Sequence, residues 1–448
     1  MLQVSGGKLV GRTAEFGRLT RLLDLAAASE PVVALVSGDA GMGKTRLVAE
    51  VAAAAAGQGF MVLSGRCAEL GDSVPYLPLA DALRSAAFGQ APPALVDAIA
   101  ARPVLGLLLP DRDTAEMAGD LPGMAQQQLF GAVLGMLAEL AETAPVLLIL
   151  EDMHWADRST RDLLTFLSRV LHRERIAVIA TYRTDDLHRG HPLRAVAAEL
   201  VRLSSVTAVE VGPLGDEAMA EHLTALAAVP LEAASLETII RRAEGNAYYA
   251  EELLAASTCG TDLPAGLADL LLARLQRLSP DGQRVVHAAA VAGRQVDDDI
   301  VRLACGLDEN EYEAAVREAV ANQLLVPDGD QGYAFRHALL REAAYADLLP
   351  GERTRLHATL ADLLADEVRL AVPGTAAELA HHSLASHDIP RAFSASIRAG
   401  KEAERLAAPA EAHRHYDQAL GLWDRVTDPE KLAGMQRGWL AFHSSTVT

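Results

Sequence analysis

The chain has 448 residues, of which 50% are hydrophobic and 22% are charged. A chain of that length is too long to fold around one ordinary hydrophobic core, so its length predicts roughly two to four domains. The composition excludes a disordered chain. The formal net charge is −20, from 60 acidic and 40 basic residues. A surface with this charge repels phosphate backbones, so free DNA is not expected as a partner.

Targeting and redox signals are absent from the sequence. The N-terminus lacks a basic segment followed by an apolar core, and the longest apolar runs are too short to cross a bilayer. The three cysteines, Cys67, Cys259 and Cys305, lie far apart and without C-x-x-C spacing, so they indicate neither a disulfide framework nor a zinc site. These features predict a cytoplasmic protein that does not contact a membrane.

The first predicted elements are a strand, a glycine loop and a helix. A run rich in β-branched residues covers 32–37 and ends at Gly38, and an alanine-rich helical pattern covers 44–56. Helical patterns separate the further short apolar runs, which predicts a parallel α/β sheet that ends near Gly212. These further runs are residues 60–64, 145–150, 176–181 and 206–211.

The rest of the chain is predicted to be helical. A proline-rich segment between the second and third strands ends in a helical pattern over residues 126–142, which predicts a helical insert. After Pro213 the pattern becomes almost wholly helical, with breaks at 261–264 and 327–332. From Arg353 onward, alanine-rich helices resemble the first units of a helical-pair repeat.

Two features of the C-terminal region bear on its interpretation. His381 and His382, near His387, have no cysteines or ordered carboxylates beside them, so they indicate a solvated helix face instead of a metal site. A polar tail is predicted at residues 443–446. Because helical arrays generally need about three units, the repeat looks unfinished, either through truncation or through gene structure.

The strongest motif is a complete phosphate loop of the form G-x-x-x-x-G-K-T. Its glycines let successive backbone N–H groups turn inward around a β-phosphate. Lys44 adds a point charge toward the β and γ oxygens, and the Thr45 hydroxyl can hold Mg²⁺. The motif consists of Gly38, Asp39, Ala40, Gly41, Met42, Gly43, Lys44 and Thr45.

Two adjacent acids follow the predicted strand at residues 145–150, namely Glu151 and Asp152. Open parallel sheets place their ligand chemistry at the carboxyl ends of strands. One acid can bind Mg²⁺ and the other can polarise water. Strand alternation points the two side chains to opposite faces, although a turn that begins here could rotate the second inward.

A cation is predicted near the same edge of the sheet. Arg183 comes just past the end of the strand predicted at residues 176–181, where a guanidinium can contact a γ-phosphate. One strand separates the phosphate loop from the acidic strand in sequence. This order is typical of the NTPase division that places an extra strand between them.

In this order and combination, the motifs resemble the ATPase module of bacterial signal-transduction ATPases of the STAND type, which are AAA-like and similar to Orc/Cdc6 proteins. The best-known bearers are the large ATP-binding LuxR-type transcriptional regulators. The resemblance runs from Leu9 to about Leu364. It rests on residues 9–12 (LVGR) with Glu15, the phosphate loop, residues 151–157 (EDMHWAD) and residues 181–183 (TYR).

The resemblance implies roles for individual residues. Either Glu151 or Asp152 would serve Mg²⁺ and activate water, and Arg183 would sense the third phosphate. Many relatives carry two Asp residues where this chain has Glu151 first. The extra methylene could move the metal contact to Asp152, so the metal ligand is left open between the two. The adenine would be bordered by Val10, Gly11 and Arg12.

Two further segments resemble parts of the same module. Residues 244–254 are similar to the glycine-asparagine-proline signature of the helical lid, with Ala247 where proline is usual. Residues 263–293 and 335–345 resemble a winged helix that packs on the nucleotide and joins domains instead of reading DNA. There, His337 would contact an ADP phosphate.

The predicted fold is therefore an α/β P-loop NTPase, with a parallel sheet that has an additional strand and a helical insert. An all-α lid, a winged-helix domain and the start of a helical-repeat domain follow it. The expected boundaries are residues 1–212 for the nucleotide-binding domain, 213–260 for the lid, 261–352 for the winged-helix-like domain and 353–448 for the start of TPR-like repeats.

The predicted function is an ATP/ADP-dependent switch with slow, Mg²⁺-dependent ATPase activity, as the N-terminal part of a LuxR-type regulator. An unknown inducer or regulatory protein would bind the helical repeats, and an oligomer could form on activation. Between Arg353 and Thr448 there is no basic recognition helix, so this chain is not expected to bind a promoter. The alternative is a nucleotide-stabilised scaffold with negligible hydrolysis. A DNA-binding initiator is disfavoured by the −20 charge.

Overall fold

The computed structural model describes residues 9–68, 74–88, 92–109, 122–227, 231–258, 266–328, 332–366, 369–372 and 374–446. The chain forms two compact units, each described by itself. Unit 1 consists of Met1–Arg18, Ser37–Val51 and Glu210–Leu356. Unit 2 consists of Leu19–Val36, Ala52–Val209 and His357–Thr448. Five elements pass from one unit to the other: α1 (Thr13–Ala27), β1 (Val32–Gly38), α2 (Lys44–Gly57), β5 (Val206–Glu210) and α16 (Pro350–Leu364).

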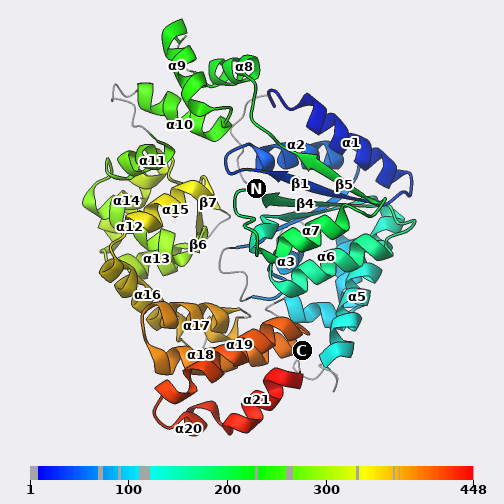
Figure 1. The fold of residues 1–448 in the computed structure, drawn as a ribbon, viewed down its shortest axis with the longest axis vertical. Helices are drawn as coiled ribbons and strands as arrows, with labels where there is room; N and C mark the ends of the chain where they lie inside the picture. The colour runs from blue at the N-terminus through cyan, green and yellow to red at the C-terminus, as the bar shows by residue number, and fades with distance from the viewer. Residues whose placement is uncertain are drawn as a thin grey trace. The chain divides into compact units, whose positions relative to one another are not determined.

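A five-stranded sheet has the order β2-β3-β4-β1-β5 (Figure 1). β2 pairs with β3, and β3 with β4, in parallel. Because β4 lies between β1 and β3, the sheet has the additional strand that the sequence order predicted. β1 and β3 are buried along their whole length, as expected for Val- and Leu-rich strands of a parallel sheet. The other strands are β2 (Met61–Arg66), β3 (Val146–Glu151), β4 (Ile176–Arg183) and β5 (Val206–Glu210).

Helices of unit 2 pack against this sheet, and Figure 1 shows α6 and α7 along one of its faces. Asp157 caps the first turn of α6 by accepting a hydrogen bond from the Thr160 N–H at 2.8 Å. The predicted helical insert is present. The helices around the sheet are α3 (Leu77–Phe88), α4 (Pro93–Ala100), α5 (Pro122–Thr143), α6 (Arg158–Val170) and α7 (Pro192–Leu200), with short 3₁₀ turns at Pro103–Leu108 and Met153–Trp155.

The C-terminal helices of unit 2 share one hydrophobic core with the sheet. Phe393 and Tyr416 belong to the same buried cluster as Leu148 and Leu163. The Tyr76 hydroxyl also donates a hydrogen bond to the Ala407 carbonyl at 3.0 Å. These helices are α17 (Thr375–Ala385), α18 (Ile389–Arg405), α19 (Pro409–Leu422), α20 (Pro429–Ala433) and α21 (Arg437–Thr446), with 3₁₀ turns at Arg369–Ala371 and Trp423–Arg425.

Unit 1 contains a small antiparallel sheet within its helices, in the order β6-β8-β7. Among the described residues after Pro213, the remaining regular elements are helices, so the prediction of an almost wholly helical region is confirmed. The strands are β6 (Gln295–Asp297), β7 (Leu325–Asp328) and β8 (Gly332–Phe335). The helices are α8 (Asp216–Leu226), α9 (Ala233–Ala243), α10 (Ala247–Thr258), α11 (Leu267–Leu275), α12 (Pro280–Ala292), α13 (Asp298–Cys305), α14 (Glu309–Ala321) and α15 (Ala338–Asp347).

Three local predictions are corrected by the structure. Arg183 is the last residue of β4 instead of lying past its end. Residues 443–446 belong to helix α21 and are not a tail. His381 and His387 are exposed, but His382 is only 2% exposed, so the prediction of one solvated histidine face is wrong. The predicted boundary at residues 261–264 lies outside the described residues.

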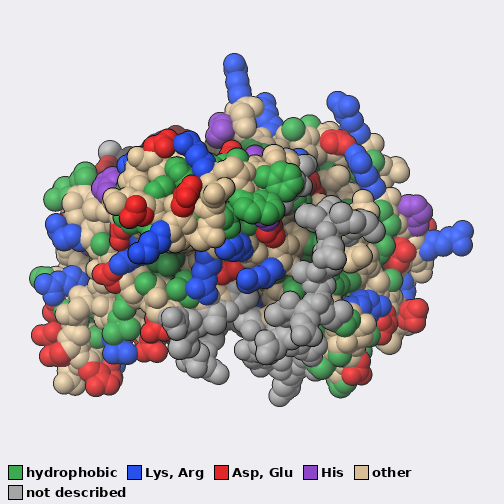
Figure 2. All heavy atoms as spheres, turned by 90° about the horizontal axis from the view of Figure 1, so that it is seen from below, with side chains coloured by type: hydrophobic (Ala, Val, Ile, Leu, Met, Phe, Trp, Pro, Cys, Tyr) green, Lys and Arg blue, Asp and Glu red, His purple; other side chains and the backbone are tan. Residues whose placement is uncertain are grey.

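The face drawn in Figure 2 carries interspersed basic and acidic side chains, with hydrophobic side chains between them. Trp439 and Phe442 on α21 are each 55% exposed, and their ring centroids lie 5.5 Å apart. The predicted parallel α/β P-loop fold, followed by a helical C-terminal region, is confirmed.

Candidate functional site

The phosphate loop in unit 1 follows β1 directly and leads into α2. The Lys44 ammonium is buried and donates hydrogen bonds to the carbonyls of Gly38 at 2.7 Å and Asp39 at 2.9 Å. Gly38 has φ +151°, and a Cβ there would lie 2.3 Å from the Val211 carbonyl oxygen. Only glycine fits this backbone. In this conformation Lys44 is therefore bonded to carbonyl groups of the loop itself.

Asn246 holds the loop from the start of α10. Its side-chain amide donates to the Ala40 carbonyl at 2.9 Å, and its carbonyl oxygen accepts from the Tyr249 N–H at 3.0 Å. At Gly41, which has φ +83°, a Cβ would lie 2.4 Å from the Asn246 Oδ1. The glycine is therefore required both by its backbone conformation and by the approach of Asn246.

Arg12 contacts the loop from the N-terminal side of unit 1. Its buried guanidinium donates to the Met42 carbonyl at 3.0 Å and to the Gly212 carbonyl at 2.5 Å, and it pairs with Glu15 at 3.1 Å. Val10 is also buried. Gly11 has φ +68°, and a Cβ there would lie 2.6 Å from the Ala218 side chain.

His337 lies at the N-terminus of α15, where its Nδ1 accepts a hydrogen bond from the Leu339 N–H at 3.2 Å. Its ring stacks on Tyr248, with centroids 3.8 Å apart and planes 10° apart. The Tyr248 N–H in turn donates to the Gly41 carbonyl at 3.2 Å. One continuous set of contacts therefore joins His337 to the phosphate loop within unit 1.

In unit 2, Glu151 and Asp152 both contact Arg66. Glu151 Oε1 lies 3.1 Å from Arg66 Nη2, and Asp152 Oδ2 lies 3.5 Å from Arg66 Nε. Asp152 has φ +57°, and its N–H donates to the Thr181 hydroxyl at 3.0 Å. The left-handed turn rotates Asp152 toward the cation that Glu151 contacts, so strand alternation does not separate the two acids.

The charges of Glu151 and Asp152 affect the pKa of Arg66. Burial alone would lower the pKa of Arg66, but the carboxylates of Glu151 and Asp152 raise it above its ordinary value. Glu151 Oε2 is buried, and among the described residues it has no hydrogen-bond partner. An unsatisfied carboxylate oxygen beside a second acid fits a magnesium ion or its bound water.

Arg183 ends β4 and is buried, with 5% of its surface exposed. Its guanidinium carbon lies 5.4 Å from the centre of the Trp155 ring, and Nη1 lies 3.5 Å from Asp186 Oδ2. His154 Nε2 lies 3.4 Å from the same carboxylate oxygen. The aromatic ring and the acid orient the guanidinium.

A last set of contacts in unit 2 joins the C-terminal helix α19 to the start of α6. Glu411 on α19 accepts hydrogen bonds from the backbone N–H groups of Arg158 at 2.8 Å and Ser159 at 3.3 Å. Its carboxylate thus sits at the N-terminus of α6, where the helix dipole favours negative charge. Burial and the Glu411 charge raise the pKa of the neighbouring Asp157 to about 7.

Sequence reasoning missed four of the residues that form these contacts: Arg66, Asn246, Tyr248 and Glu411. A signal existed for Arg66, because parallel strands end at one edge, and Arg66 stands opposite Glu151 in the register of β2 and β3. The predicted strand ended too early, at Ser64, to include it. Asn246 lay in a recognised segment but was not assigned a role.

Comparison with known proteins identifies the N-terminal part of the chain. The family described as the AAA ATPase domain matches residues 8–179. An uncharacterized protein of Rhizobium meliloti (strain 1021) is 25% identical over 463 residues, which cover 95% of this chain and 44% of that protein. This chain therefore spans less than half the length of that relative.

Solved structures also align with this chain. A Signal Transduction ATPase with Numerous Domains (STAND) with a tetratricopeptide repeat sensor, from Pyrococcus horikoshii, aligns with a TM-score of 0.50 and 11% identity. The alignment covers 96% of this chain and 64% of that one, so this chain spans less than two thirds of it. The Orc1 protein of Aeropyrum pernix, solved with DNA, aligns at a TM-score of 0.35 and 16% identity over 76% of this chain and 93% of that chain.

The chain therefore matches the AAA ATPase domain over residues 8–179, and its fold is similar to that of a STAND protein. Such a domain binds nucleotide, typically with Mg²⁺. Within the described residues, no helix has the length and apolar character needed to span a membrane.

Proposed function

We propose that this chain is a signal-transduction ATPase that acts as a nucleotide-dependent switch, and that it forms part of a LuxR-type transcriptional regulator. The proposal is supported above all by the contacts that run from the phosphate loop through Asn246 and Tyr248 to His337. In these contacts, Asn246 and Tyr248 bond to the loop backbone and Tyr248 stacks on His337. A change in the conformation of the loop on nucleotide binding would therefore be passed directly to α15 through these contacts.

In this proposal the loop binds the phosphates of ATP or ADP. Lys44 exchanges the carbonyls of Gly38 and Asp39 for phosphate oxygens, because an ammonium interacts more strongly with an anion than with a neutral carbonyl. Backbone N–H groups of the loop then cradle the β-phosphate. Thr45 would hold Mg²⁺, which would neutralise charge on the phosphates.

The acidic strand would support hydrolysis. Glu151 is proposed to orient the attacking water through its unbonded Oε2, while Asp152 assists the metal. Arg66 contacts both carboxylates, and its charge offsets their mutual repulsion. Arg183 would contact the third phosphate from the end of β4, and Trp155 and Asp186 hold it there.

The switch requires two states that the nucleotides favour differently. We propose that ADP holds the lid and His337 closed on the phosphate loop, and that ATP with an inducer or regulatory protein favours the open state. The inducer would bind the C-terminal helices, by analogy with the tetratricopeptide repeat sensor of the STAND protein from Pyrococcus horikoshii. Glu411 offers a route within unit 2 from those helices to the segment after Asp152.

The chain would act from the cytoplasm and oligomerise only on activation. It would not bind DNA by itself, because of its −20 charge. Salt-dependent binding of duplex DNA at micromolar protein concentration would contradict this part of the proposal.

The first experiment follows bound nucleotide and released phosphate after the purified chain is mixed with radiolabelled ATP and Mg²⁺. Binding with slow phosphate release, both lost in Lys44→Ala and kept in Lys401→Ala, supports the switch. Lys401 is an exposed lysine on α18 and serves as the matched control. Binding without release supports the alternative, a nucleotide-stabilised scaffold, and absence of binding refutes both.

A second experiment tests His337. Removal of its ring leaves Tyr248 without its stacking partner, so His337→Ala should speed ADP dissociation. An unchanged ADP dissociation rate would refute a role for His337 in holding the closed state.

A further inference from the structure

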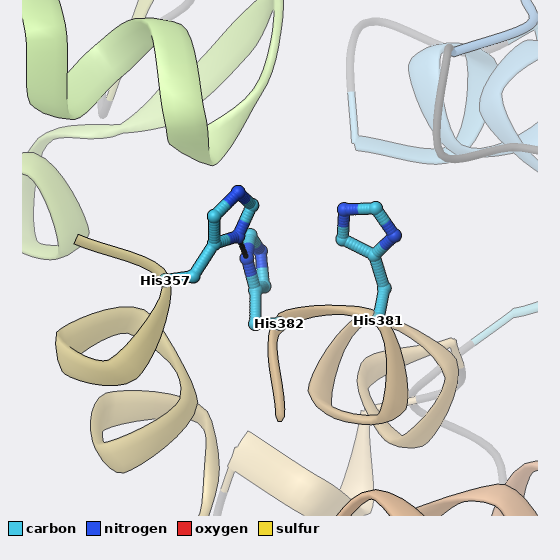
Figure 3. A group of neighbouring side chains, drawn as sticks. All are labelled: His357, His381 and His382. Atoms are coloured by element: carbon cyan, nitrogen blue, oxygen red, sulfur yellow. Dashed lines mark hydrogen bonds between the residues drawn. The ribbon is translucent and has the colours of Figure 1, made fainter. Parts of the chain in front are cut away.

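Three histidines of unit 2 gather where α16 meets α17. His357 comes from α16, and His381 and His382 are adjacent on α17 (Figure 3). The ring centroid of His357 lies 5.6 Å from that of His381 and 4.9 Å from that of His382. One ring nitrogen from each residue can be chosen so that all three lie within 4.8 Å of one another.

The two buried rings face each other through the same kind of atom. His357 Nδ1 lies 2.7 Å from His382 Nδ1, and each residue is only 2% exposed (Figure 3). In this contact one nitrogen donates a proton and the other accepts it. An ion held between them would bind both lone pairs at once, which needs a separation of about 3.3 Å for two ligands of a tetrahedral zinc ion. The two nitrogens, now 2.7 Å apart, would have to separate by about 0.6 Å to bind the ion together.

The third histidine, His381, lies where an ion can enter the cluster. His381 is exposed, so an ion can reach the cluster from solvent on its side. Imidazole binds metals through a ring nitrogen of its neutral form.

We propose that His357, His381 and His382 form a binding site for a divalent transition-metal ion of the zinc class. Three imidazole nitrogens favour Zn²⁺, Co²⁺, Ni²⁺ or Cu²⁺ over Mg²⁺ and Ca²⁺, which prefer oxygen ligands. The fourth position of the ion is left to water or to a ligand. Since the ligands come from two helices, the bound ion ties α16 to α17, at the start of the C-terminal helices that the proposed switch uses as its sensor.

The test measures Co²⁺ binding to the full-length, metal-free chain without nucleotide. Excess Mg²⁺ is present to occupy oxygen-ligand sites. Tetrahedral Co²⁺ absorbs visible light strongly, so its absorption reports the geometry as well as the stoichiometry. We expect one Co²⁺ per chain, displaced by Zn²⁺, with binding that weakens as the pH falls because the imidazoles must lose their protons.

Two variants test whether Co²⁺ binds to these three histidines and not to other histidines of the chain. His381→Ala removes an exposed ligand and leaves the buried pair packed. It should weaken Co²⁺ binding about tenfold or more, because loss of a direct ligand should cost at least as much as loss of an outer-shell partner. His387→Asn is the matched control, because His387 is exposed just beyond the end of α17, has φ +64°, and asparagine tolerates that backbone. This control should bind Co²⁺ as the unchanged chain does.

Three results would overturn the proposal: absence of saturable Co²⁺ binding, binding unaffected by His381→Ala, or binding lost in His387→Asn. His382→Gln adds a second arm, with circular dichroism as the check on folding. A folded His382→Gln chain that keeps full Co²⁺ affinity would also contradict the site. The nucleotide-binding assay is independent of this result, so the metal site and the proposed switch can fail separately.

Discussion

The phosphate loop in unit 1 and the acidic strand end in unit 2 are held in different ways. The loop is held by neutral backbone carbonyls that accept hydrogen bonds from Lys44, Arg12 and Asn246. The acids Glu151 and Asp152 are held by one buried cation, Arg66. The loop therefore depends on backbone shape and small residues, whereas the acidic end depends on a balance of buried charge.

This difference predicts different responses to substitution. Removing a donor from the loop costs about one hydrogen bond, roughly 0.5–1.5 kcal/mol, or up to about 3 kcal/mol when the donor is charged. Removing the cation from the acidic end takes away the counter-ion that Glu151 and Asp152 share, which costs about 3–5 kcal/mol. Substitutions at the acidic end should therefore change the free energy of unfolding most, and those in the loop should change it least.

Arg66→Met should destabilise the chain by about 3–5 kcal/mol, because Glu151 and Asp152 would lose their buried counter-ion. Urea unfolding followed by circular dichroism measures the change. Arg158→Met is the control, since the side chain of Arg158 is 68% exposed and its pair with Asp162 lies on the surface. That control should cost less than about 1 kcal/mol. Equal losses in the two variants would show that charge burial does not govern the acidic end.

Glu151→Gln should lower the rate of phosphate release by about a hundredfold or more, the usual contribution of a general base. Binding of ATP should change little, because the amide keeps the shape of the side chain. Asp152→Asn is the companion variant, and there the Mg²⁺ concentration needed for half-maximal release should rise. If instead Glu151→Gln shifts the Mg²⁺ requirement and Asp152→Asn stops release, the two roles are reversed.

Local patterns in the sequence predicted the phosphate loop, the buried strand before Glu151 and the additional strand of the parallel sheet. These features depend on residues that are near one another in the chain, or on the periodicity of one element. The position of Asp152 was left open, because alternation favoured opposite faces and only the observed left-handed turn decides between the two alternatives.

The missed features all depend on distant parts of the chain. Arg66 meets Glu151 only because β2 lies next to β3, and Asn246 meets Ala40 across more than two hundred residues. The burial of His382 likewise depends on His357 from another helix. Hydrophobic periodicity reports which face of an element is apolar, but it does not identify the element that covers that face.

The free energy of unfolding should also depend on pH, through Asp157 at the N-terminus of α6. Because its pKa is about 7 in the folded chain and 3.8 is the ordinary value, the folded state binds more protons than the unfolded state between these pH values. The free energy of unfolding should therefore fall as pH rises through that window, by at most about 1.4 kcal/mol per pH unit from this group. Asp157→Asn should remove this part of the slope, whereas Asp97→Asn, at an exposed site, should keep it.

The smallest effect is expected in the loop, from Asn246→Ala. The variant loses the bond to the Ala40 carbonyl and the cap of the Tyr249 N–H, each worth about 1 kcal/mol. Since these bonds fix the loop in its closed form, ADP should dissociate several-fold faster, while the ΔG of unfolding changes by no more than about 2 kcal/mol. Stopped-flow release of a fluorescent ADP measures the rate. Asn322→Ala, which loses a bond to the Glu318 carbonyl on an exposed helix end, should leave it unchanged. If ADP leaves the Asn246→Ala chain at the unaltered rate, the lid does not hold the loop closed, and the contacts from Gly41 to His337 would be structural only.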